Sequence, residues 1–182
     1  MQPSNEATRH GVCLAIFDLG VLLIGDSGIG KSEIALSLVD RGHQLIADDA
    51  VTIKRNAEGE VMTSCPGVLQ DFLEVRGLGI LNVRKMFGDS AICRQKSLSL
   101  IVRLERFSAT DLPHIDRLHG LHHEEDVLGV TLPQVTIPLA PGRNMAILTE
   151  AAVRKYKIRE AGYYTEQVFT ARQRAELAKK DQ

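Results

Sequence analysis

The spacing of apolar residues predicts two buried strands followed by a helix near the start of the chain. Residues 11–17 form a continuous apolar run typical of a buried strand, and residues 21–24 form a second one after a tight turn. Residues 33–41 instead place apolar side chains at helical intervals. One face of this helix collects four of them: Ile34, Ala35, Leu38 and Val39. We therefore expect a hairpin-like opening whose second strand leads into a helix.

Extended segments continue through the middle of the chain and predict a β-rich domain. Residues 44–53 are typical of a strand, but the adjacent carboxylates Asp48 and Asp49 interrupt it. Residues 72–82 form another extended run. Within that run Glu74 and Arg76 stand two positions apart, so an extended backbone would present both on one face.

The last third of the chain predicts a loop, further strands and two helices. Residues 107–126 are polar and charged, which is typical of a mobile loop, and Arg117 lies within it. β structure resumes on both sides of Pro133, which we expect to split it into two strands. Residues 138–144 predict a rigid basic turn that opens a helix. A second helix at 165–179 has a narrow apolar stripe, suited to packing on the body or on a neighbouring subunit: Val168, Ala171, Ala175 and Ala178.

Length and composition favour one globular domain over residues 1–182. The chain is 44% hydrophobic and has no internal repeat or low-complexity linker. A formal net charge of −1 and a pI of about 6.6 disfavour nucleic-acid or membrane-surface binding. The polar start and the absence of a long apolar run predict a cytoplasmic protein without a membrane segment. Three widely spaced cysteines, Cys13, Cys65 and Cys93, predict free thiols.

The most informative stretch is a complete G-x-x-x-x-G-K-S pattern placed between the second predicted strand and the helix. Its residues are Gly25, Asp26, Ser27, Gly28, Ile29, Gly30, Lys31 and Ser32. Glycines let successive backbone N–H groups and the helix N-terminus converge on an anion, and the lysine adds positive charge. The hydroxyl at the helix start is placed to reach a magnesium ion held between phosphates. The pattern predicts a nucleotide phosphate site; the alternative is a plain glycine turn.

Ionisable residues elsewhere are candidates for the same site. Burying two adjacent charges is costly, so Asp48 and Asp49 are expected at a sheet end that faces a site, although an exposed strand-end turn explains them equally well. His10 precedes the first apolar strand, at the end that would lie beside the phosphate loop. The histidines at 119, 122 and 123 lack the spacing of a closed zinc site and favour a solvated segment.

Taken together, these residues resemble the catalytic C-terminal domain of the bacterial HPr kinase/phosphorylase family. The resemblance covers most of the chain. It is carried by the phosphate loop, by the A-D-D run at 47–49, and most specifically by the run L-E-V-R-G-L-G-I-L-N at 73–82. It implies an α/β fold in which a P-loop-containing mixed β-sheet has flanking helices, similar to the phosphoenolpyruvate carboxykinase-like nucleotide-binding core.

The resemblance also implies an activity. Family members use ATP and Mg2+ to phosphorylate a seryl hydroxyl of the phosphocarrier protein HPr in the regulation of carbon metabolism. They remove that phosphate with inorganic phosphate, which gives pyrophosphate, and they assemble as hexamers. A small-molecule P-loop kinase and a non-catalytic nucleotide sensor are the two alternatives, which a metabolite screen and an assay of transfer to protein serine would distinguish.

Residue roles follow from the same resemblance. Asp49 matches the family's catalytic acid and base, and Asp48 would support it. His10, Lys31 and Arg117 match further active-site positions. Ser32 and Glu74 look like metal ligands, and Arg76 and Arg143 are candidates to hold phosphate or the phosphoserine by forked hydrogen bonds, with surface salt bridges as the alternative.

The chain departs from the family pattern in two ways. Nothing in it corresponds to the separate N-terminal domain of the family, so we expect an excised catalytic domain or a short form. The family's basic turn often has the sequence P-V-R-P-G-R, whereas Leu139 and Ala140 replace its V-R pair here. One positive charge is therefore missing from an element associated with the dephosphorylation direction.

Overall fold

The computed structural model describes residues 5–108 and 116–180, in which nine strands form one mixed sheet and two form a separate hairpin. The strands are β1 (Glu6–His10), β2 (Val12–Ile16), β3 (Leu19–Ile24), β4 (Gln44–Ala47), β5 (Ala50–Arg55), β6 (Val61–Ser64), β7 (Phe72–Val75), β8 (Gly79–Asn82), β9 (Gln95–Arg106), β10 (Leu121–Val127) and β11 (Val130–Leu139). The helices are α1 (Lys31–Asp40), α2 (Val83–Phe87), α3 (Met145–Glu160) and α4 (Thr165–Lys180), with short 3-10 helices η1 (Gly67–Leu69) and η2 (Asp89–Ala91).

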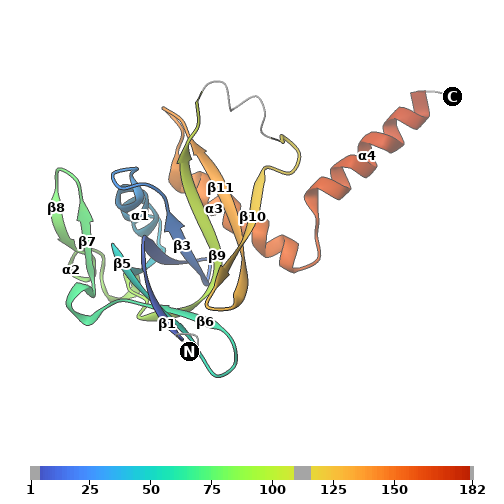
Figure 1. Ribbon diagram of the computed structural model, residues 1–182. Coiled ribbons are helices and arrows are strands. Elements are labelled where there is room, and N and C mark those ends of the chain that lie inside the picture. The colour runs from blue at the N-terminus through green and yellow to red at the C-terminus, as the bar shows by residue number, and fades with distance from the viewer. Residues whose placement is uncertain (1–4, 109–115, 181–182) are drawn as a thin grey trace.

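Strand β3 lies near the middle of the large sheet and delivers the chain to the phosphate loop (Figure 1). It pairs antiparallel with β2, as the hairpin-like opening predicted, and parallel with β9. Strand β11 also pairs with β9 in parallel, and β10 pairs with β11. The parallel strands β3, β9 and β11 therefore end at one edge of the sheet, where ligands of α/β proteins usually bind.

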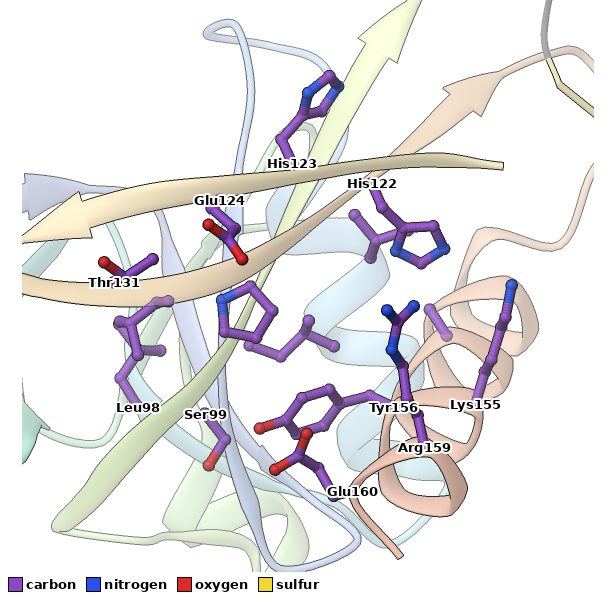
Figure 2. A pocket seen from close by; sticks show the side chains of 15 residues that line it. Leu98, Ser99, His122, His123, Glu124, Thr131, Lys155, Tyr156, Arg159 and Glu160 are labelled. Carbon is purple, nitrogen blue, oxygen red and sulfur yellow. The ribbon is translucent and has the colours of Figure 1, made fainter. Parts of the chain in front are cut away.

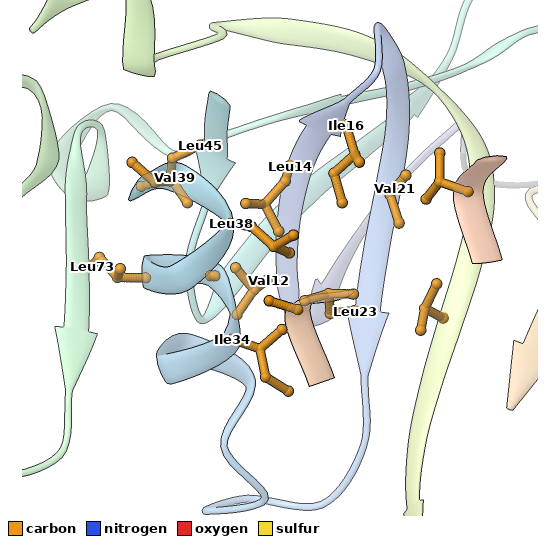
Figure 3. Close-up of a cluster of buried hydrophobic side chains, with 14 of the residues drawn as sticks. Val12, Leu14, Ile16, Val21, Leu23, Ile34, Leu38, Val39, Leu45 and Leu73 are labelled. Carbon is orange, nitrogen blue, oxygen red and sulfur yellow. The ribbon is translucent and has the colours of Figure 1, made fainter. Parts of the chain in front are cut away.

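Burial on both faces explains why β2 and β3 are continuous apolar runs rather than alternating ones. Alternate residues of the two strands pack under α1, where Leu14 and Leu23 meet Leu38 (Figure 3). The intervening residues join a second cluster on the opposite face, which includes Cys13 and Ile53. The residues of both clusters are buried, and this hydrophobic burial fixes β3 and α1 relative to each other.

Most of the predicted elements are confirmed, including the break of the 44–53 strand at the two aspartates. Strand β1 was not predicted, because its exposed and half-buried residues alternate without an apolar run. The interpretation of residues 107–126 as a loop is wrong in part: residues 109–115 lie outside the described ranges, but β10 occupies the end of the segment. Glu124 and Asp126 are exposed on this outer strand, which pairs with β11, while Glu125 is half-buried and forms an ion pair with Arg9 of β1.

Two expectations about strand continuity are wrong. Strand β11 runs through Pro133 without a break. At Pro133 the strand pairs only with β10, because its pairing with β9 begins at Gln134, so the missing N–H of the proline is tolerated there. The extended run at 72–82 folds back on itself as the β7–β8 hairpin, with its turn at 76–78. Gly77 and Gly79 both have positive φ, which the turn requires.

Helix α4 projects away from the rest of the fold (Figure 1). Of its predicted apolar stripe, Val168 is half-buried while Ala171, Ala175 and Ala178 are exposed. The expected packing of this stripe on the body is therefore not found among the described residues. Packing on a neighbouring subunit stays a prediction.

The expectation of free thiols is confirmed for Cys13, Cys65 and Cys93. Burial raises the pKa of the Cys13 thiol to about 12, so it packs as an apolar group. None of the helices in the described part of the chain combines the length and apolarity needed to cross a membrane.

Candidate functional site

The phosphate loop joins the end of β3 to the start of α1, as predicted. Gly25 has a φ of +148°, and a Cβ at this position would lie 2.5 Å from the backbone oxygen of Leu104. A side chain is therefore excluded here by both conformation and contact. Gly30 adopts the left-handed conformation as the N-cap of α1. The loop thus curls over the N-terminus of a ten-residue helix, whose dipole favours an anion.

Lys31 is held inside this loop rather than extended into solvent. It is only 7% exposed, and its ammonium donates to the carbonyl oxygens of Gly25 at 2.9 Å and Asp26 at 3.0 Å. These bonds fix a positive charge at the centre of the loop. The same side chain lines the hollow on which the loop opens.

Asp48 connects the helix start to the β7–β8 hairpin. Its Oδ1 accepts a hydrogen bond from Ser32 Oγ at 3.2 Å, and its Oδ2 accepts one from the backbone N–H of Glu74 at 2.8 Å. Burial raises the pKa of Asp48, and these two hydrogen bonds oppose that rise. The carboxylate therefore sets the distance between Ser32 and Glu74, two residues far apart in the sequence.

Asp49 differs from its neighbour because it points outward from a strained backbone. Its φ is +65°, in the left-handed region, and its side chain is 71% exposed. His10 Nδ1 lies 2.9 Å from Asp49 Oδ1 and 3.2 Å from its backbone oxygen, while the N–H of Gly11 also donates to that backbone oxygen. Strand β1 and the residue after it therefore hold an exposed carboxylate in one place.

Arg76 lies in the turn of the β7–β8 hairpin and reaches back to the phosphate loop. A Cβ built on Gly28 would meet the Arg76 guanidinium at 3.0 Å, so the arginine lies directly against that glycine. The hairpin thus adds a second positive charge to the loop. As predicted, Glu74 and Arg76 face the same hollow, although Arg76 lies in the turn and not in the strand.

These groups surround a polar hollow of about 180 Å³. Its lining is His10, Gly11, Ser27, Gly28, Gly30, Lys31, Ser32, Glu33, Asp48, Asp49, Glu74 and Arg76. Of the predicted site residues, Gly25, Asp26 and Ile29 belong to the loop but not to this lining. The two predicted arginines Arg117 and Arg143 are not in it either. Both are exposed, and Arg143 donates to the backbone oxygen of Pro138 at 3.0 Å.

The oxygen atoms in the hollow fit a magnesium ion better than a metal held wholly by protein. No group of three His, Cys, Asp or Glu residues within the described ranges is arranged to hold an ion. Mg2+ typically takes one or two protein oxygens and completes its shell with water and phosphates. The hydroxyl of Ser32 and the exposed carboxylate of Glu74, kept in place through Asp48, supply that kind of donor set.

A larger cavity of about 790 Å³ lies elsewhere, between the β9–β11 part of the sheet and α3. Figure 2 shows Lys155 and Arg159 side by side on α3, with His122 above them. Burial lowers the pKa of His122, and the two neighbouring cations lower it further. None of the site residues predicted from the sequence lines this cavity. We place the candidate site at the smaller hollow, because the reactive groups converge there.

Sequence reasoning missed two features of the site and its support. Glu33 lines the hollow from the first turn of α1, and only its position after the loop pointed to it. At the other end of α1, Glu150 of α3 accepts bonds from Arg41 at 2.6 and 2.9 Å and lies 2.8 Å from His43 Nε2. This cluster fastens the phosphate-loop helix to α3, and no short-range pattern reveals a contact over more than a hundred residues.

Comparisons with known proteins all identify relatives of one family. A family model described as the HPr Serine kinase C-terminal domain matches residues 2–173. The HPr kinase/phosphorylase of Nitrosomonas europaea is 46% identical over 171 residues, which cover 94% of this chain and 53% of that protein. The HPr kinase/phosphorylase of Xylella fastidiosa strain M12 is 48% identical over 168 residues, covering 92% and 53%.

A solved structure agrees in fold. It is described as the Hpr(Ser) kinase/phosphatase from Coxiella burnetii, and it matches with a TM-score of 0.79 and 36% identity over 90% of this chain and 98% of that one. The predicted mixed-sheet P-loop fold with flanking helices is thereby confirmed. The chain spans about half the length of the curated relatives it matches.

Proposed function

The chain belongs to the family of HPr serine kinase C-terminal domains, and from this premise we propose that it transfers the γ-phosphoryl group of ATP to a serine of HPr or an HPr-like protein. The observation that carries the proposal is the convergence of the phosphate loop and the Asp49 carboxylate on one hollow. Phosphoryl transfer requires mainly alignment and neutralised charge, which such a hollow supplies. Residues 1–182 would act as one catalytic domain.

In the kinase direction the seryl oxygen attacks the γ-phosphorus of ATP and ADP leaves. Asp49 accepts the proton of that seryl hydroxyl. His10 orients that carboxylate, which the 2.9 Å separation supports. Lys31 and the loop N–H groups stabilise charge on the phosphoryl oxygens. Asp48 supports the reaction indirectly by positioning Ser32 and Glu74.

Ser32 and Glu74 would hold Mg2+, which would neutralise charge on the outer phosphates of the nucleotide. Arg76 lies against Gly28 and would bind a phosphoryl oxygen from the hairpin side. Arg117 and Arg143 are outside the hollow, so their roles require a movement of their segments toward it when substrates bind. The missing positive charge at Ala140 makes Arg143 the remaining arginine of that turn.

In the reverse direction we propose that inorganic phosphate occupies the loop and attacks the phosphorus of phosphoserine. The phosphorus–oxygen bond to serine breaks, Asp49 returns its proton to the seryl oxygen, and pyrophosphate forms. The proposal extends to an assembly of six copies in the cytoplasm. Sedimentation of the purified chain tests the assembly, because a stable monomer at micromolar concentration would contradict it.

The deciding experiment mixes the chain with magnesium-ATP and HPr, and then adds phosphate. We expect phosphoserine on HPr, followed by its loss with one pyrophosphate per serine released. Transfer to metabolites without HPr would instead favour a small-molecule kinase. Nucleotide binding without transfer to any protein serine would favour a nucleotide sensor.

Lys31→Ala is the matching test of the loop. Loss of the ammonium leaves the outer phosphates less neutralised, and a loss of about 10²- to 10³-fold in kcat is the usual scale for one such group. Normal turnover of ATP and HPr by this variant would contradict the proposed role of the loop.

A further inference from the structure

The β7–β8 hairpin carries large apolar side chains on its solvent face, directly beside the reaction hollow. Leu78 is 66% exposed at its turn and Ile80 is 73% exposed on β8, with Phe72 partly exposed on β7. We call these three residues the apolar hairpin face. Single exposed apolar residues are ordinary, but several grouped at the edge of a site indicate an interaction surface.

The register of the hairpin places this face next to the reacting groups. Ile80 pairs directly with Glu74 across the two strands, so both side chains lie on the same face. Phe72 is two residues from Glu74 on β7 and shares that face as well. The turn between them holds Arg76, which lies against the phosphate loop. The apolar face is therefore continuous with the rim of the hollow.

The described residues, 5–108 and 116–180, leave this face exposed. The opposite side of the hairpin is the one that packs into the core, where Leu73 and Val75 are buried with residues of α1. Figure 1 shows the hairpin at the border of the fold, beside α1 and apart from the large sheet. Within the described ranges, Leu78 and Ile80 are therefore left open to contact with a partner.

The size of the hollow limits how much of the proposed protein substrate can enter it. A space of about 180 Å³ takes phosphoryl groups and the seryl group that receives them, but not the body of a protein. The remainder of a protein substrate must rest on the rim. The hairpin contributes Glu74 and Arg76 to the lining, and its exposed apolar side chains, Leu78 and Ile80, lie next to these two residues in the hairpin.

We propose that the apolar hairpin face is the docking surface for the phosphoacceptor protein, and that it receives apolar side chains flanking the reacting serine. This inference rests on the proposed kinase function and adds how the protein substrate is selected. Three side chains give a small apolar contact, which suits a partner that binds and leaves in each catalytic cycle. Serine peptides without apolar neighbours would be poor substrates.

The test uses the whole chain with the substitutions Leu78→Ser and Ile80→Thr, singly and together. Threonine keeps the β-branched shape that suits a strand. We expect the KM for HPr to rise roughly tenfold or more in the double variant, which is about 1.4 kcal/mol at 25 °C. The KM for ATP and the nucleotide affinity should stay unchanged.

Ile158→Thr is the matched control. Ile158 is 42% exposed on α3, a helix that contacts α1, β9 and β11 rather than the hairpin, so its substitution should leave the KM for HPr unchanged. A second measurement uses HPr variants in which the apolar residues that flank the phosphorylated serine are replaced by polar serine residues, and it determines the KM for each variant. If those residues dock on the hairpin, the combined effect with Ile80→Thr will be less than additive.

Several outcomes would overturn the proposal. An unchanged KM for HPr in the folded double variant would remove the hairpin from substrate selection. Variants that sediment with a lower mass than the wild type would assign the face to contacts between copies instead. If the wild type labels no serine of HPr at all, the proposed kinase function fails and the docking proposal falls with it.

Discussion

The hydroxyl of Ser32 donates a hydrogen bond to Asp48 Oδ1 over 3.2 Å, and this bond joins the phosphate-loop helix to the acidic strand end. The second oxygen of Asp48 accepts from the backbone of Glu74. One buried carboxylate therefore holds together three segments that the sequence separates. The position of the proposed metal ligands depends on it.

The first prediction concerns this link. Asp48→Asn replaces one of the two acceptor oxygens by an NH2 donor. If this donor faces Glu74, the Glu74 N–H loses its acceptor; if it faces Ser32, the bond reverses and occupies a lone pair of the hydroxyl that would bind the metal. Residues that orient metal ligands typically contribute 10- to 100-fold to metal affinity. We expect the magnesium concentration for half-maximal activity to rise by about that factor, measured by titration at saturating ATP. The same change at the exposed Asp40 of α1 is the control and should have no effect.

Asp49→Asn should separate binding from chemistry. The side chain is exposed, so an isosteric amide leaves the hollow intact, but it cannot accept the seryl proton. We predict nucleotide affinity within about twofold of the wild type by calorimetry, with transfer to HPr and phosphate-dependent release both lowered at least about 10²-fold. Kinase activity retained at the wild-type level would remove Asp49 from its role.

Gly25→Ala tests the geometry of the loop. The new methyl group would lie 2.5 Å from the Leu104 oxygen at a φ of +148°, and relief is limited because that oxygen belongs to the backbone of β9. We expect a loss of about 1–3 kcal/mol in the free energy of unfolding, together with weaker ATP binding. Gly42→Ala is the control, because φ is +92° there but nothing lies within 4 Å, and conformational strain alone costs about 1 kcal/mol. Equal losses in the two variants would contradict the proposed clash.

The Arg41–His43–Glu150 cluster predicts a loss of stability in acid. Hydrogen bonds from Arg41, and then from His43, lower the pKa of Glu150 from 4.5 to about 2 against the opposing effect of burial. A carboxyl whose folded-state pKa is lowered stabilises the fold above its unfolded pKa, and that contribution disappears as the pH falls from about 4.5 to about 2. Glu150→Gln should remove this component of the acid dependence.

The measurement for the cluster is the free energy of unfolding as a function of pH. At pH 7 we expect Glu150→Gln to cost about 1–3 kcal/mol, since Arg41 and His43 lose a charged partner. Glu176→Gln on the exposed α4 serves as the control and should be neutral. If the free energy of unfolding falls equally with decreasing pH in the wild type and in Glu150→Gln, the cluster is not the source of the acid sensitivity.

The local pattern of the sequence was sufficient for the strand, loop and helix that form the phosphate site. Apolar runs require burial, helical spacing requires one buried face, and Gly25 and Gly30 take backbone conformations closed to other residues. The break at Asp48 and Asp49 was also predictable, because two adjacent charges cannot remain inside a buried strand. These inferences need only neighbours along the chain.

Long-range contacts required the tertiary structure. The run at 72–82 is compatible with one extended strand, and only its packing on α1 makes it a hairpin that presents Ile80 beside Glu74. Likewise β10 forms from polar residues because β11 supplies its hydrogen bonds. The sequence by itself was sufficient to predict a phosphate site at the loop, since backbone geometry and charge are local. Which carboxylates and arginines lie beside that loop was decided by the fold, because their separation depends on how the sheet and hairpin pack.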